Sequence, residues 1–123
     1  MHDERLKVES RTLDGVPLIH PYGEIDLYTV PEFERAISAA LDGGAPSMIV
    51  DLSDITYLDS SGLSALIVTY KKLAAMDGDL YVVAPDEPPA VRRVLEITRI
   101  DRFIHVRPTL DKVIEELRLS HAA

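Results

Sequence analysis

The chain has 123 residues, 46% of them hydrophobic and 28% charged, which is the balance of one soluble globular domain. The absence of cysteine excludes disulfides and thiolate metal ligands, and the apolar runs are too short to predict a membrane span. Acidic residues outnumber basic ones by 21 to 13, and the formal net charge of −8 argues against nucleic acid and anionic membranes as partners. Because residues 1–7 are charged and lack an apolar stretch, no secretory signal is visible and a cytoplasmic protein is expected.

The chain opens with two segments that read as extended, residues 5–13 and 16–22. Between them, Asp14-Gly15 tolerates the positive φ values of a tight turn, so the two segments predict a β-hairpin. A turn is then expected over residues 23–26.

A first helix is predicted to follow this turn. Thr29 and Glu32 have the spacing of a capping box, and Pro31 is tolerated in a first helical turn. Gly43-Gly44 is expected to end the helix. Its inward stripe is predicted to be apolar: Phe33, Ile37, Ala40 and Leu41.

The remaining chain alternates between short apolar strands, predicted over residues 47–52, 80–84 and 103–106, and amphipathic helices. A polar connection leads from the first of these strands to a helix that begins after Asp59. The stripes of the three helices are Leu63, Leu66, Ile67, Tyr70 and Ala74; Val91, Val94, Leu95 and Thr98; and Val113, Ile114 and Leu117, the last helix being capped by Thr109.

Strands separated by helices of this length favour parallel pairing with right-handed crossovers. The sequence therefore predicts one α/β domain over residues 1–123, with a core of about 5–119. The expected sheet is mixed but mostly parallel, is flanked by about four helices, and carries the hairpin at its N-terminal end.

The segment Asp59-Ser60-Ser61-Gly62 combines an acid, two hydroxyls and a glycine at the start of a helix. Capping alone can explain an aspartate or serine at this place, since it satisfies the first free amides. Two hydroxyls and a glycine exceed what one cap needs, and a helix N-terminus also favours an added phosphate. The glycine is interpreted as leaving room for a close approach by another chain.

In wider context, this segment resembles the signature of STAS domains in anti-sigma factor antagonists. The likeness extends over nearly the whole chain, because four further segments match in the right order. The matching segments are Leu58–Leu63, Gly23–Asp26 with Thr29, Ser47–Leu52, Asp77–Leu80, and Val94–Thr98 continuing to Phe103.

The resemblance implies a bacterial switch protein that binds an anti-sigma factor which is also a serine kinase. The unphosphorylated antagonist would release the sigma factor, phosphorylation at Ser60 would end binding, and a serine phosphatase would reverse the modification. The implied partner-binding residues are Asp26, Asp59, Ser61, Gly62 and Leu63. No catalytic residue, metal or cofactor is implied.

Two other classes remain open. STAS folds also serve as scaffold subunits of stress-sensing complexes and as subunits of lipid transporters. A receiver domain phosphorylated on aspartate fits the size and α/β order, but the expected acid pair after the first core strand is absent.

His20 and His105 lie in strand-like segments and are interpreted as satisfied core or edge histidines. A monomer is expected, because no exposed apolar stripe is evident.

Overall fold

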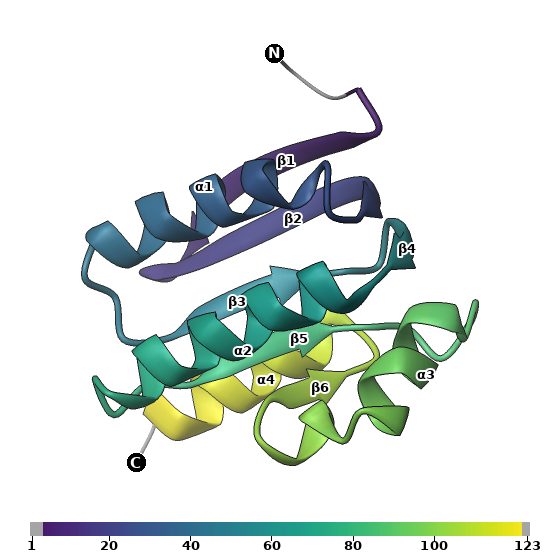
Figure 1. Ribbon diagram of the computed structural model, residues 1–123. Helices are drawn as coiled ribbons and strands as arrows, with labels where there is room; N and C mark the ends of the chain where they lie inside the picture. Colours follow the sequence, from purple (N-terminus) through teal and green to yellow (C-terminus); the bar gives the residue numbers. More distant parts are fainter. Residues whose placement is uncertain (1–3, 122–123) are drawn as a thin grey trace.

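The computed structural model describes residues 4–121, so the ends of the predicted domain, 1–3 and 122–123, lie outside the described residues. Six strands form one sheet with helices on both faces (Figure 1). The strands are β1 Leu6–Leu13, β2 Val16–Ile25, β3 Met48–Asp51, β4 Ile55–Leu58, β5 Leu80–Val83 and β6 His105–Arg107. The helices are α1 Val30–Asp42, α2 Ser60–Ala74, α3 Ala90–Ile97, α4 Leu110–His121 and the 3₁₀ helix η1 Ile100–Arg102.

The predicted hairpin and the mostly parallel sheet are confirmed. The strand order is β1-β2-β3-β5-β6, with β1 antiparallel to β2 and the other pairs parallel. Asp14 and Gly15 have φ values of 49° and 83°, which is the left-handed backbone that a two-residue hairpin turn requires.

Strand β4 was not predicted from the sequence, where a polar connection was expected at its position. β4 pairs in parallel with the end of β2, so that Ile25 lies opposite Leu58, and β2 continues to Ile25 where a turn was expected. Only Ile55 and Leu58, the two ends of β4, are buried, so the strand lacks the alternation that marks a half-buried strand.

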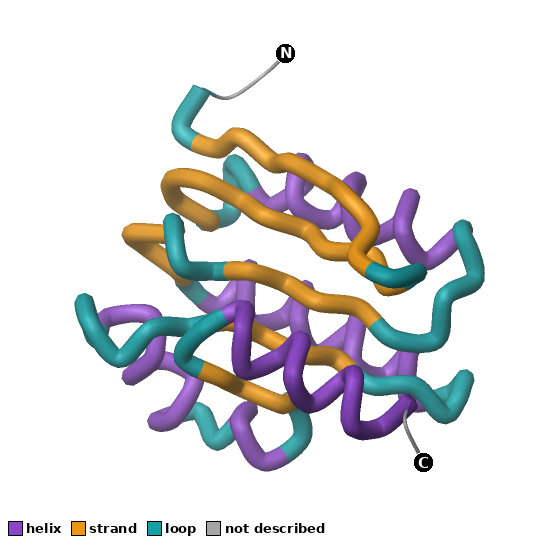
Figure 2. Tube along the Cα trace, turned by 180° about the vertical axis from the view of Figure 1, so that it is seen from behind, coloured by secondary structure: helices purple, strands orange, loops and turns teal. Residues whose placement is uncertain are grey.

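The two faces of the sheet are covered unequally. Helices α1, α2 and α3 lie on one face and bury the larger hydrophobic core, which includes Phe33, Leu66 and Leu95 (Figure 1). On the other face α4 packs over a smaller core around Ile49 and Val113, and Figure 2 shows that this helix leaves the β1–β2 side of the sheet uncovered.

The buried stripe of α2 differs from the predicted one by a rotation of the helix. Of the predicted residues only Leu66 is buried, while Ile67 is 39% exposed and Ala74 is exposed. Small residues and a threonine face the sheet in their place: the buried positions are Gly62, Ala65, Leu66, Thr69 and Leu73. Thr69 tolerates burial because its hydroxyl donates to the Ala65 carbonyl at 2.7 Å.

Two smaller expectations are also wrong. The Thr29 hydroxyl does not cap α1; it is buried, donates to the Glu24 carbonyl at 2.8 Å and accepts from the Asp26 amide. Phe103 lies outside the last strand, follows η1 and is 62% exposed. By contrast, the cap of α4 is confirmed, since the Lys112 amide donates to the Thr109 hydroxyl at 3.2 Å.

Candidate functional site

The predicted site residues meet at one edge of the sheet, where β2 and β4 end together. Because Ile25 is paired with Leu58, the next residues of the two strands, Asp26 and Asp59, leave the sheet side by side. The Asp59 amide donates to the Ile25 carbonyl at 3.2 Å, which ties the two chain segments directly. The start of α1 and the start of α2 are therefore neighbours.

Asp59 is the N-cap of α2. Its backbone is extended, with φ −106° and ψ −169°, and its Oδ1 accepts a hydrogen bond from the Ser61 amide at 2.9 Å. This confirms that capping is one role of the Asp59-Ser60-Ser61-Gly62 segment. The cap fixes where α2 begins, and so it fixes where Ser60 lies.

Ser60 is the first residue of α2 and is exposed to solvent. Among the residues that the structure describes, none forms a hydrogen bond with its hydroxyl, so a reactant can reach this oxygen. Ser61 and Leu63 are half-buried, and the Leu63 side chain packs against the main core. A partner that contacts this turn would thus meet Ser60 first.

Gly62 is buried, and the structure gives a reason for it within the chain. A Cβ at this position would lie 2.2 Å from Cδ1 of Leu58 and 3.0 Å from Cγ2 of Ile25. The space beside Gly62 is therefore taken by β2 and β4 of the same molecule, where the sequence analysis supposed that it receives another chain. The glycine lets α2 approach the strands closely.

Asp26 is held by its own loop. Its Oδ1 accepts hydrogen bonds from the amides of Tyr28 at 2.8 Å and Thr29 at 3.0 Å, and its Oδ2 lies 2.9 Å from Nη1 of Arg5. Desolvation raises the pKa of Asp26, but the two amide bonds and Arg5 together outweigh it, so the pKa lies below its ordinary value. Asp26 is consequently an anion in a rigid turn.

The exposed apolar side chains at this edge were not predicted from the sequence. Leu27 and Tyr28 follow Asp26 and are 68% and 75% exposed, and Tyr57, near the end of β4, is 50% exposed. The Arg5 guanidinium lies 6.0 Å from the centre of the Tyr28 ring. The tyrosine in a short loop next to a predicted site residue was the available signal, because aromatic residues are enriched in protein interfaces.

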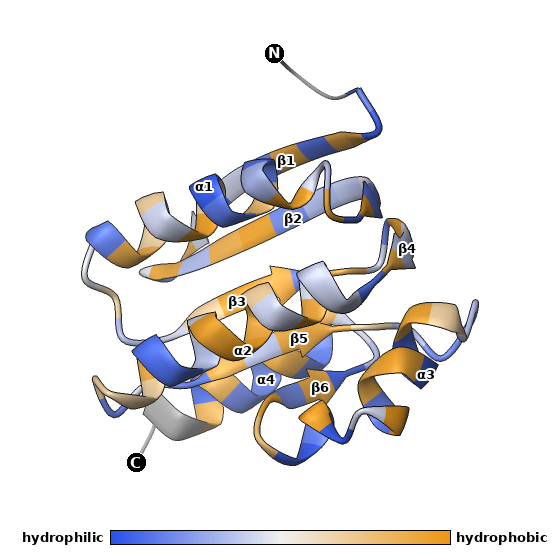
Figure 3. Cartoon of the chain, in the orientation of Figure 1, coloured by the Kyte–Doolittle hydropathy of each residue, from blue (hydrophilic) through white to orange (hydrophobic). Residues whose placement is uncertain are grey.

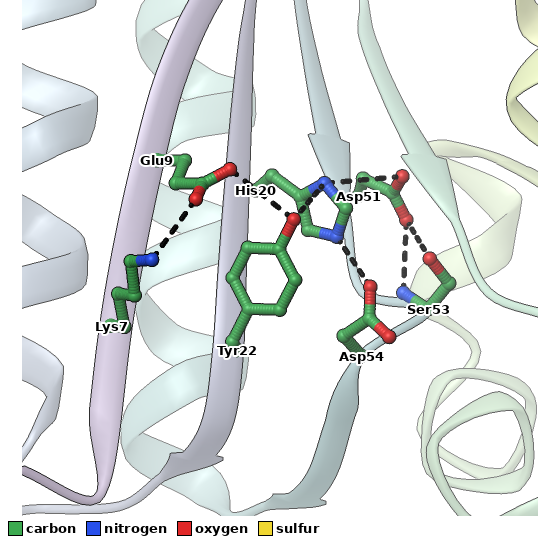
Figure 4. Close-up of polar contacts among 7 residues, drawn as sticks. All are labelled: Lys7, Glu9, His20, Tyr22, Asp51, Ser53 and Asp54. Carbon is green, nitrogen blue, oxygen red and sulfur yellow. Dashed lines mark hydrogen bonds and ion pairs between the residues drawn. The ribbon is translucent and has the colours of Figure 1, made fainter.

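A second polar cluster lies on the uncovered β1–β2 side of the sheet (Figure 4). His20 contacts Asp54 with 2.7 Å between Nε2 and Oδ2, and its ring stacks on Tyr22 at 4.2 Å. His20 is therefore satisfied, as the sequence analysis interpreted it. The hydrogen bond from Lys7 is the main reason that the pKa of Glu9 is lowered, and desolvation is the main reason that the pKa of Tyr22 is raised.

Within residues 4–121, no group of three or more histidine or acidic side chains is arranged to hold a metal ion. None of the described helices has the length and apolar character that crossing a membrane requires.

The fold and this edge of the sheet define the class of the protein. The family model for the STAS domain matches residues 7–113, so the chain belongs to the STAS domain family. The anti-sigma-B factor antagonist of Staphylococcus aureus is 33% identical over 101 residues, which cover 82% of this chain and 92% of that protein.

Solved structures show the same fold. An anti-sigma factor antagonist from Mycobacterium paratuberculosis superposes with a TM-score of 0.85 at 34% identity, covering 96% of this chain and 99% of that one. The anti-sigma factor antagonist SpoIIAA, solved in unphosphorylated and phosphorylated forms, gives TM-scores of 0.68 and 0.66. At 22% and 19% identity, with 92% and 90% of this chain covered and 97% and 99% of those, SpoIIAA shows the fold alone.

Proposed function

We propose that this protein is a cytoplasmic anti-sigma factor antagonist that is switched by phosphorylation of Ser60. Its unphosphorylated form binds an anti-sigma factor with serine kinase activity and so frees a sigma factor, and a serine phosphatase restores the binding form. The names of the similar S. aureus and M. paratuberculosis proteins support the antagonist role. The observation that carries the proposal is the exposure of Ser60 at the first position of α2, beside the N-cap residue Asp59.

The docking surface comprises the first turn of α2 and the loop after β2. Ser61 and Leu63 contribute from α2, and Asp26 contributes a fixed negative charge from the neighbouring loop. Leu27 and Tyr28 supply exposed apolar area that a partner can bury. Gly62 contributes indirectly, because its lack of a side chain allows this turn to pack closely on β2 and β4.

Charge explains how a phosphate on Ser60 would release the partner. A phosphoserine adds about 1.5 to 2 negative charges next to Asp59 and on the same edge as Asp26. A negative charge of the bound partner about 4 Å from this phosphate would be repelled by about 4 kcal/mol per unit charge at an effective dielectric of 20. Reversing an occupancy from about 99:1 to 1:99 needs about 5.5 kcal/mol, so repulsion and dehydration of the phosphate together have the required size.

The test is to incubate the protein with its cognate kinase and ATP and to map the phosphate by mass spectrometry. We expect the phosphate on Ser60. Ser60→Ala should bind the kinase whether or not ATP is present, and Ser60→Glu should bind weakly. Ser64→Ala is the matched control, since Ser64 is an exposed serine one turn further along α2, and this variant should still be phosphorylated and released.

Phosphate on a different residue would refute the assignment. Equal affinities of Ser60→Ala and Ser60→Glu for the kinase would refute the electrostatic mechanism.

A further inference from the structure

An apolar groove of about 210 Å³ lies between the second half of α2 and the segment around η1. Ile67 and Tyr70 of α2 form one wall, and Ile100 and Phe103 form the other. The rings of Tyr70 and Phe103 are 6.1 Å apart and tilted by 49°. Both segments lie on the face of the sheet that α1, α2 and α3 cover, and both contain hydrophobic residues, which are orange in Figure 3.

The groove exposes large apolar side chains that the fold does not use. Phe103 is 62% exposed and Ile67 is 39% exposed, and both line the groove. Apolar grooves are used in peptide recognition, where they receive the apolar face of an amphipathic helix. The monomer expected from the sequence, on the premise that no apolar stripe is exposed, stays a prediction.

The charges at the groove are opposite to those of the whole protein. Lys71 lines the groove, and Arg99 and Arg102 lie in the segment of the other wall. All three are exposed, and among the residues that the structure describes none of them forms an ion pair. Asp101 is the one acid in this short segment, whereas the chain as a whole carries a net charge of −8.

We infer that this groove binds an acidic amphipathic segment of a partner protein. The apolar side chains of that segment would pack against Ile67, Tyr70 and Phe103, and its carboxylates would face Lys71 and Arg102. Charge complementarity of this kind steers a partner and fixes its register.

Two other occupants fit the groove less well. A small amphiphile is normally enclosed over most of its surface, but here Phe103 stays largely in solvent. A second copy of this chain, paired symmetrically through the groove, would set one basic surface against an identical basic surface. An acidic segment of another protein meets neither difficulty.

The groove is separate from the phosphorylation site. Ile67 follows Ser60 by seven residues, so the two lie about 10 Å apart along the helix axis. Charges on exposed groups at such a distance are largely screened at physiological salt, where the Debye length is about 8 Å. Binding in the groove is therefore expected to persist when Ser60 carries negative charge.

The test uses three fluorescent helical peptides in anisotropy titrations. One has leucine and phenylalanine on one face and glutamate elsewhere, the second has lysine in place of every glutamate, and the third is a non-amphipathic scramble of the first. We expect saturable binding of the first peptide alone. Phe103→Ser and Lys71→Glu should each weaken it at least tenfold, and Ser60→Glu should leave it unchanged.

Leu119→Ser is the matched control, because it removes a 68% exposed apolar side chain from α4 on the other face of the sheet. This variant should bind the first peptide like the unmodified protein. Circular dichroism of all variants should show native helix content, which the exposure of the changed side chains leads us to expect.

The inference is overturned if the first peptide does not bind saturably, or if the lysine peptide or the scramble binds equally well. It is also overturned if Phe103→Ser and Lys71→Glu leave binding unchanged. Displacement of the peptide by decanoate, a small amphiphile, at lower concentration than by unlabelled peptide would overturn it as well. A dimer in sedimentation that Phe103→Ser dissociates would also overturn it, because a second copy would then fill the groove. None of these results bears on whether Ser60 is phosphorylated, so the two proposals fail independently.

Discussion

The two ends of α2 face solvent for different reasons. At its start, Asp59 caps the helix, Asp26 is held in the neighbouring loop, and hydrogen bonds to backbone amides fix both carboxylates. In its second half, Ile67 stays 39% exposed and Tyr70 is only half-buried, although burying them fully would stabilise the fold. The comparison teaches that a helix can present a rigid polar end for modification and an unfilled apolar side for packing.

The largest expected effect separates two neighbours on α2. Leu66→Ala should lower the free energy of unfolding by about 2–5 kcal/mol, because the side chain is fully buried against the sheet. Ile67→Ala should lower it by less than about 1 kcal/mol, because that side chain is 39% exposed. Urea unfolding of both variants measures the difference. If the two substitutions cost the same, the rotation of α2 described above is incorrect.

Gly62→Ala should come next. Alanine normally stabilises a helix by about 0.5–1 kcal/mol relative to glycine. Here its Cβ would lie 2.2 Å from Cδ1 of the buried Leu58, and overpacking of this kind costs about 1–3 kcal/mol. We therefore expect a net loss of stability in thermal unfolding. Ser64→Ala, on the exposed side of the same helix, is the control and should be neutral or slightly stabilising.

Removing the cap of α2 should have a moderate effect. Asp59→Ala leaves the Ser61 amide without its partner and should cost about 1 kcal/mol of stability. Asp59→Asn keeps an acceptor oxygen and should recover most of that loss. Chemical denaturation of both variants tests this, and it also sharpens the comparison, because no substitution of an exposed groove residue should disturb the start of the helix. An Asp59→Ala variant as stable as the unmodified protein would contradict the capping role.

The smallest expected effect on stability is that of the Asp26 charge, which its pH dependence identifies. Because the pKa of Asp26 is lower in the folded state than in the unfolded chain, ionisation stabilises the fold above the unfolded value of about 3.9. This contribution is lost as the pH falls through the folded pKa.

The measurement compares unmodified protein with Asp26→Asn, which keeps an oxygen for the Tyr28 and Thr29 amides. The unmodified protein should be the more stable at pH 7, and the difference should shrink as the pH is lowered below about 4. A difference that stays constant down to pH 2 would show that the charge of Asp26 contributes nothing.

Local patterns in the sequence were sufficient for the hairpin at Asp14-Gly15, the alternating α/β order and the cap at Asp59, because turns and caps depend on residues within a few positions of each other. Those same patterns placed Ser60 at a helix start. They could not reveal β4, whose four residues gain their strand geometry from pairing with β2, more than thirty positions away in the chain.

Tertiary structure alone decided three features of this protein. The pairing of Ile25 with Leu58 brought Asp26 beside Asp59, close packing at Gly62 set the rotation of α2, and that rotation left Ile67 and Tyr70 beside Phe103 in an apolar groove. The physical reason is that a stripe of apolar residues tells which positions can be buried, whereas the shape of the opposing sheet selects which of them are.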